Sequence, residues 1–164
     1  MDFRVGFGYD VHRLAEGESL WLGGVEIPHT KGTVAHSDGD VLIHALSDAL
    51  LGAAGLRDIG HYFPDTDEEF KNIDSKKLLL KVVRLLSESG FAVGNIDCTI
   101  AAQQPRLADY MSDMKRKLAE VLNIDKNSVG LKATTTERLG FEGREEGISA
   151  YAVVLIYKKE AKDI

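Results

Sequence analysis

Three residues near the start of the chain have the types and spacing of metal ligands. Asp10 and His12 stand two apart in an extended stretch, where such side chains project to the same side. His44 lies in a predicted helix and supplies a ring nitrogen from a second element. One carboxylate and two imidazoles with a fourth position open are typical of catalytic zinc, although non-haem iron uses the same donors. On spacing alone, a loop histidine and a helix-face histidine also explain the pattern.

Two polar segments lie near these residues in sequence. Residues 36–40 (His-Ser-Asp-Gly-Asp) precede the predicted helix, where Ser37 or Asp38 can cap it and free N–H groups favour an anion. Capping does not explain His36. Asp48 follows His44 by one helical turn and either faces solvent or orients the free ring nitrogen of a metal-bound imidazole.

Two loops carry further groups of interest. Residues 58–67 are rich in turn formers and contain three carboxylates, which fit either a solvated loop or contacts to sugar hydroxyls and metal-bound water. Residues 134–136 are three threonines that offer hydroxyls to phosphate, and Glu137 offers oxygen to a hard cation. The glycines of 138–147 permit close backbone approach, and Arg144 suits bidentate phosphate binding.

The elements that must position these residues follow from periodicity. Strands are predicted at 3–9, 20–22, 25–27, 95–101, 129–134 and 148–157, and helices at about 40–54, 75–89 and 107–122. Consecutive strands at both ends of the chain argue against a strictly alternating, doubly wound sheet. We therefore expect an α+β fold in which helices pack on one face of a mixed β-sheet, with residues 1–164 as a single catalytic domain.

Composition restricts the function classes. The 164 residues carry a net charge of −6 without a long basic run, so no nucleic-acid partner is expected. No apolar run is long enough to span a bilayer, so no membrane partner is expected either. Cys98 is the only cysteine, which rules out an internal disulfide and predicts a cytoplasmic location.

Taken together, these segments resemble one enzyme family, the 2-C-methyl-D-erythritol 2,4-cyclodiphosphate synthases. The resemblance runs in order through nearly the whole chain. The motifs that carry it are residues 8–12 (GYDVH), 36–41 (HSDGDV), 44–46 (HAL), 58–60 (DIG), 63–67 (FPDTD), 103–107 (QQPRL) and 132–147 (KATTTERLGFEGREEG).

The resemblance implies a lyase of the non-mevalonate isoprenoid pathway. Such enzymes convert 4-diphosphocytidyl-2-C-methyl-D-erythritol 2-phosphate, a cytidine diphosphate substrate, into the cyclodiphosphate and CMP. Asp10, His12 and His44 match the zinc ligands, and Glu137 matches the residue that helps to hold Mg²⁺ or Mn²⁺. The resemblance also implies a homotrimer with active sites between neighbouring subunits.

The resemblance assigns catalytic and substrate-contacting positions as well. His36 and Thr135 match residues that stabilise the transition state. The positions that match substrate contacts are Asp10, Val11, His12, His36, Ser37, Asp58, Ile59, Gly60, Phe63, Pro64, Asp65, Thr66, Asp67, Ala102, Gln103, Gln104, Pro105, Arg106, Leu107, Ala108, Thr134, Thr135, Thr136, Glu137, Phe141 and Arg144.

Two other classes are compatible with the same residues. A metal-dependent phosphodiesterase or hydrolase would use the three metal ligands with an activated water and would leave a free monophosphate. A non-catalytic nucleotide- or isoprenoid-binding protein would keep its ligand after loss of His44.

Overall fold

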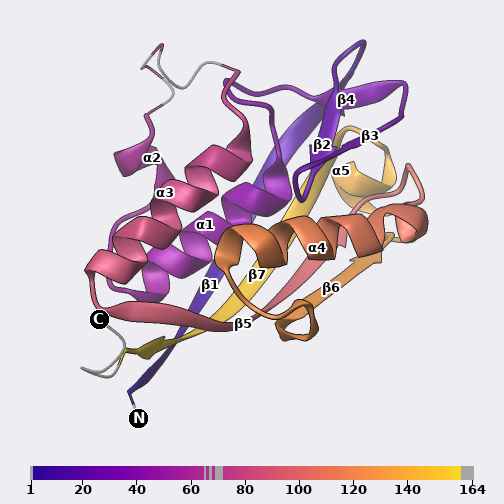
Figure 1. Ribbon diagram of the computed structural model, residues 1–164. Coiled ribbons are helices and arrows are strands. Elements are labelled where there is room, and N and C mark those ends of the chain that lie inside the picture. The colour runs from indigo at the N-terminus through magenta and orange to yellow at the C-terminus, as the bar shows by residue number, and fades with distance from the viewer. Residues whose placement is uncertain (1, 65, 67, 69–71, 160–164) are drawn as a thin grey trace.

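A five-stranded sheet with three long helices over one of its faces forms the centre of the molecule (Figure 1). The computed structural model describes residues 2–64, 66, 68 and 72–159. The sheet order is β4-β1-β7-β5-β6, in which β5 and β6 are parallel and the other pairs antiparallel. The strands are β1 Phe3–Glu16, β4 Lys31–Thr33, β5 Phe91–Ala101, β6 Val129–Thr134 and β7 Gly147–Lys158, with β2 Leu20–Leu22 and β3 Val25–Ile27 as a separate hairpin. The mixed sheet with one helical face confirms the predicted architecture.

The central helix is α1 (Val41–Ala53), which lies on β1 and β7 and is flanked by α3 (Ser75–Glu88); α4 (Met111–Leu122) covers the side of β6 (Figure 1). Helix α1 is buried on nearly all sides because its residues are apolar all round except for His44, Ser47 and Asp48, whereas α3 and α4 have one apolar face. Its first turn is capped by the fully buried Asp40, whose carboxylate accepts hydrogen bonds from Ile43 N, Gly23 N and Gly24 N. The cap is thus neither Ser37 nor Asp38, and it also holds the β2–β3 turn.

Two glycines let the backbone of β1 lie directly against α1. A Cβ placed on Gly8 would be 1.9 Å from the carbonyl oxygen of Ala45, and one on Gly6 would be 1.9 Å from that of Ala49. Both glycines occupy even-numbered positions of β1, as do Asp10 and His12, so all four face the helix. This contact sets how near the strand comes to His44.

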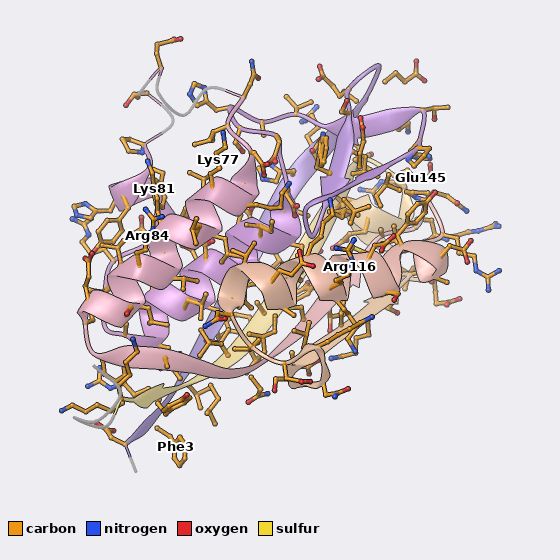
Figure 2. All side chains as sticks on the ribbon, in the orientation of Figure 1. Phe3, Lys77, Lys81, Arg84, Arg116 and Glu145 are labelled. Atoms are coloured by element: carbon orange, nitrogen blue, oxygen red, sulfur yellow. The ribbon has the colours of Figure 1, made fainter. Side chains whose placement is uncertain are left out.

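The opposite face of the sheet carries an exposed apolar patch, which we call the outer sheet face. It is formed by odd-numbered residues of β1 and by their neighbours on β7. Its members are Phe3, Val5, Phe7, Tyr9, Val11, Tyr151 and Val153. Figure 2 shows the side chain of Phe3 pointing away from the helices. Contiguous exposed apolar side chains of this extent mark an interaction surface rather than a solvated one.

The structure differs from the predicted elements at several boundaries. Strand β1 continues to Glu16, so Asp10 and His12 lie inside the strand and not after it. The helix predicted at 107–122 begins at Met111, after a short 3-10 turn (η2, Ala108–Tyr110). Strand β5 begins at Phe91. Four short elements among the described residues were not predicted: β4, α2 (Ile59–Tyr62), the 3-10 turn η3 (Lys126–Ser128) and α5 (Gly140–Gly143).

Cys98 is a free, buried cysteine on β5. Burial raises the pKa of its thiol to about 12. Among the described residues, no helix has both the length and the apolar character needed to cross a membrane.

Candidate active site

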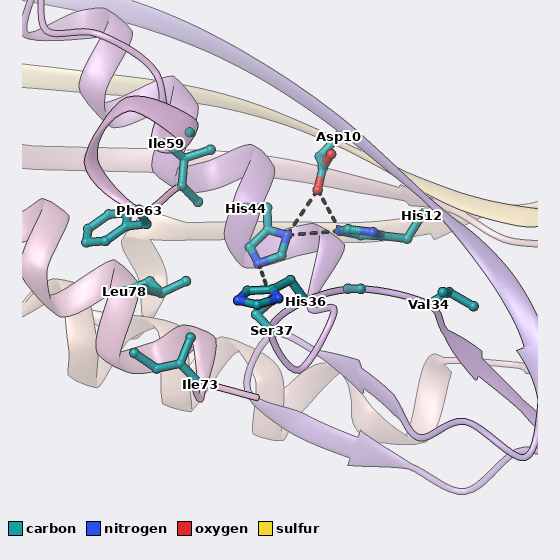
Figure 3. A pocket seen from close by; sticks show the side chains of 12 residues that line it. Asp10, His12, Val34, His36, Ser37, His44, Ile59, Phe63, Ile73 and Leu78 are labelled. Carbon is teal, nitrogen blue, oxygen red and sulfur yellow. Dashed lines mark hydrogen bonds and ion pairs between the residues drawn. The ribbon is translucent and has the colours of Figure 1, made fainter. Parts of the chain in front are cut away.

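Asp10, His12 and His44 bring one donor atom each to a single point (Figure 3). His12 Nε2 lies 2.9 Å from His44 Nδ1, and Asp10 Oδ2 lies 3.0 Å from the former and 3.1 Å from the latter. Donors bonded to one tetrahedral zinc ion at about 2.0–2.1 Å would stand about 3.3 Å apart. Hydrogen bonds explain this arrangement of Asp10, His12 and His44, which we call the metal triangle, less well than a metal ion does. Two ring N–H groups that both donate to Asp10 would face one another at 2.9 Å. The donor set therefore fits a divalent cation.

The charges at this point are strongly coupled. Burial alone raises the pKa of the Asp10 carboxyl, but hydrogen bonds from His12 and His44 outweigh it and hold the pKa well below its usual range. Burial lowers the pKa of His44, while the hydrogen bond and charge of Asp10 oppose this and leave the pKa above its ordinary value. An ionised Asp10 between two imidazoles is a site that attracts positive charge.

The other ring nitrogen of His44 points away from this triangle toward two hydroxyls. Its Nε2 lies 3.1 Å from Ser75 Oγ and 3.2 Å from Ser37 Oγ. Asp48 makes no such contact: its Oδ1 accepts a hydrogen bond of 2.7 Å from Ile59 N, and the side chain is half-buried rather than facing solvent. Both sequence interpretations of Asp48 were therefore wrong. Asp48 instead holds the start of α2 against α1.

A cavity of about 410 Å³ opens beside the triangle (Figure 3). One wall carries the polar groups, and the other is apolar. The residues that line it are Asp10, His12, Val34, Ala35, His36, Ser37, His44, Ile59, Gly60, Phe63, Ile73 and Leu78. It thus brings together eight of the residues that the sequence singled out. Val34, Ala35, Ile73 and Leu78 were missed, since isolated apolar residues carry no sequence signal of a cavity wall.

A second cavity, of about 560 Å³, lies at the ends of β5 and β6. Its lining residues are Ala102, Gln103, Gln104, Pro105, Arg106, Leu107, Ala108, Met111, Leu131, Lys132, Ala133, Thr134 and Thr135. Residues 102–108, which the resemblance assigns to substrate contacts, and two of the three threonines are therefore adjacent. The two cavities have no lining residue in common.

Glu137 lies near the second cavity and not in the metal triangle. Thr135 Oγ1 donates to Glu137 Oε1 at 3.2 Å, and the backbone N–H of Arg138 donates to Gln103 Oε1 at 3.1 Å. Glu137 and Arg138 both have left-handed backbone conformations, with φ of 54° and 65°. The Gln103 bond ties this strained loop to the 102–108 segment.

Other predicted substrate-contacting residues line neither cavity within this chain. Asp58 caps α2 by accepting from His61 N. Val11 is exposed on the outer sheet face, and Arg144 forms an exposed ion pair with Glu146 at 3.0 Å. The rest of this group are Pro64, Thr66, Thr136, Glu137 and Phe141. Asp65 and Asp67 lie outside the described residues.

The model of the YgbB family matches residues 3–157. The 2-C-methyl-D-erythritol 2,4-cyclodiphosphate synthase of Parabacteroides distasonis is 61% identical over 96% of this chain and 98% of its own length.

Solved structures agree in fold. The bifunctional IspDF of Campylobacter jejuni superimposes with a TM-score of 0.93 at 46% identity, covering 97% of this chain; this chain spans only 43% of that protein. The Plasmodium falciparum IspF in complex with CDP gives a TM-score of 0.84 at 33% identity, covering 96% of this chain and 97% of its own. With a family model matched over almost its full length, the chain belongs to the YgbB family.

Proposed function

We propose that this chain converts 4-diphosphocytidyl-2-C-methyl-D-erythritol 2-phosphate into 2-C-methyl-D-erythritol 2,4-cyclodiphosphate and CMP. The observation that carries the proposal is the convergence of Asp10, His12 and His44 at a cavity, in a chain 61% identical to a synthase of that name. An oxygen of the 2-phosphate attacks the β-phosphorus, and the bond from that phosphorus to the CMP oxygen breaks. No water is consumed.

The residues around the first cavity suit the methylerythritol end of this substrate. Asp10, His12 and His44 would hold Zn²⁺, which supplies positive charge to phosphate oxygens. His36 and Ser37 offer polar groups on the same wall, while Ile59 and Phe63 offer an apolar surface to the carbon chain. The protein mainly holds nucleophile and electrophile together, and such intramolecular orientation contributes about 7–11 kcal/mol. An ionised phosphate needs no general base.

The second cavity suits the nucleotide. Backbone groups of 102–108 and the hydroxyls of Thr134 and Thr135 border it, and the P. falciparum relative is described in complex with CDP. Thr135 and Glu137 stand beside it, joined by their hydrogen bond. Glu137 would hold Mg²⁺ or Mn²⁺, the hard cations that prefer oxygen, with Thr135 assisting charge stabilisation at the β-phosphate.

A homotrimer would let two such cavities from neighbouring copies serve one substrate. Two observations support this assembly. The cavities share no lining residue within the chain, and the outer sheet face offers each copy an apolar surface to bury.

The reaction class is tested by the phosphorus NMR spectrum of the products. Incubation of the cytidine diphosphate substrate with the full chain, Zn²⁺ and Mg²⁺ should give a cyclic diphosphate and CMP, with CMP as the only phosphate monoester in the spectrum. A methylerythritol product that keeps a free phosphate monoester would instead identify a hydrolase. Binding of the substrate without turnover would identify a binding protein.

We expect Glu137→Gln to raise the Mg²⁺ or Mn²⁺ concentration needed for half-maximal activity by about tenfold, while bound zinc stays level. The change removes the charge but leaves an oxygen to accept the Thr135 hydrogen bond. Activity is titrated against each cation, with Glu145→Gln, in the same loop, as the control for loss of charge. A metal dependence equal to that of the control would contradict the role.

Two impaired variants, assayed at a Mg²⁺ concentration too low to support Glu137→Gln, should restore activity in mixed trimers. If His44 of one copy and Glu137 of its neighbour serve one site, every trimer that contains both His44→Ala and Glu137→Gln chains holds one site with neither change. An equal mixture, dissociated and reassociated, should then recover about a quarter of wild-type activity. Mass spectrometry of tagged chains verifies mixing. Mixed trimers without recovery would place both residues in a site within one chain.

A further inference from the structure

A line of hydrogen bonds leads from the far side of His44 to a buried serine and on to a carboxylate. His44 Nε2 lies 3.1 Å from Ser75 Oγ, and Ser75 Oγ donates in a short hydrogen bond to Asp38 Oδ1. The backbone N–H of Ser75 donates to Asp38 Oδ2 at 2.8 Å. Ser75 has no exposed surface and does not line the first cavity, so its hydroxyl serves neither solvent nor a ligand there.

The direction of these bonds fixes the tautomer of His44. A carboxylate only accepts, so the Ser75 hydroxyl gives its proton to Asp38 and turns a lone pair toward the imidazole. In the neutral imidazole, which is the form that binds a metal, His44 Nε2 must then carry the proton, which leaves the lone pair of Nδ1 free for an ion placed between Asp10 and His12. This is the tautomer that a metal ligand needs.

The carboxylate at the end of the line is itself held on several sides. Asp38 Oδ1 also accepts from Asp40 N at 3.1 Å, and Asp38 N donates to Ile73 O at 3.1 Å. Asp38 therefore joins the loop before α1 to the beginning of α3. The position of the His44 imidazole therefore depends on the loop before α1 and on the beginning of α3, as well as on α1 itself.

We propose that Ser75 and Asp38 are positioning residues for His44, which orient its ring and fix its tautomer for metal binding. The inference rests on the metal site of the proposed function. Ser37, whose Oγ lies 3.2 Å from the same nitrogen, is the lesser partner, since it borders the cavity and also accepts from Gly39 N.

The proposal predicts weaker metal binding when the hydroxyl is removed. Ser75→Ala should raise the Kd for Zn²⁺, measured by competition with a chromogenic chelator at constant pH, by about tenfold or more. Ser47→Ala is the matched control. Ser47 is also fully buried, lies on α1 one turn from His44, and its hydroxyl has no hydrogen-bond partner among the described residues. Its replacement should leave the Kd for Zn²⁺ unchanged.

A double-mutant cycle shows whether Asp38 acts through Ser75. Asp38→Asn alone should also weaken Zn²⁺ binding. If the two residues form one line, the double variant should bind Zn²⁺ no more weakly than the weaker single variant. The visible absorption of bound Co²⁺ gives a readout independent of activity, and it should change in Ser75→Ala and not in Ser47→Ala.

The outcomes separate this inference from the metal site itself. If wild type and Ser47→Ala bind Zn²⁺ and Ser75→Ala binds it equally well with the same Co²⁺ spectrum, the positioning role is overturned and the site stands. Additive losses in the cycle would overturn the role of Asp38 through Ser75. If the wild type binds no metal, both the site and the inference fall. If Ser75→Ala does not fold, Asp38→Asn is compared with the wild type and Ser47→Ala in the same two measurements.

Discussion

Gly8→Ala is expected to destabilise the fold by about 3 kcal/mol or more, a large part of the 5–15 kcal/mol typical of a domain. The added methyl would meet the carbonyl oxygen of Ala45 at 1.9 Å and the backbone nitrogen of Ala49 at 2.8 Å. These are backbone atoms, so no rotamer change relieves the clash. Strand and helix must separate instead. Equilibrium unfolding in urea measures the loss.

The control is Gly52→Ala, at the other end of α1. A Cβ at Gly52 meets nothing within 4 Å, and alanine is the better helix former, so this variant should be about 0.5–1 kcal/mol more stable than the wild type. If Gly8→Ala unfolds within 1 kcal/mol of the wild type, the close packing of β1 on α1 is wrong.

His44→Ala is expected to abolish stoichiometric zinc binding and to lower kcat at least about a thousandfold, which corresponds to about 4 kcal/mol of transition-state stabilisation. Removing one of the three proposed ligands would leave Asp10 and His12, which lie on one strand and would approach an ion from one side only. Alanine favours helix, so α1 should persist. Elemental analysis and steady-state kinetics give the two quantities.

The control is His29→Ala, which also removes a histidine. His29 lies outside both the metal triangle and the first cavity. Its zinc content and kcat should equal those of the wild type. Zinc content that survives in His44→Ala would remove His44 from the ligand set, whatever its activity.

The convergence of the metal triangle was predictable because the position of each of its residues follows from the periodicity of its own strand or helix. Strand alternation places Asp10 and His12 on one side, and the apolar helix that contains His44 has to pack on that strand. The position of the strand end was wrong by seven residues, yet Asp10, His12 and His44 converge as predicted, since alternation inside an extended segment does not depend on where the segment ends.

The contacts of His44 on its far side were not predictable. Ser75 lies 31 residues away at the beginning of another helix, where serine is explained by helix capping alone. Asp38 looked like a cap for α1 and instead accepts the first N–H of α3. Strand β4 has three residues, too few for a period to show, and it lacks the Gly-Gly turn that marks the equally short β2 and β3 as a hairpin.

The alternation of β1 also limits how this chain tolerates insertions and deletions. One residue added or lost between Gly8 and Asp10 would turn both ligands to the outer sheet face and send Val11 toward α1. Two residues would restore the side but displace the ligands along the strand by about 6.6 Å, which is beyond the reach of His44. Length variation in this segment thus carries two independent penalties, one chemical and one of packing. It must be confined to looser turns such as that around Gly17, where an added Cβ would meet nothing within 4 Å.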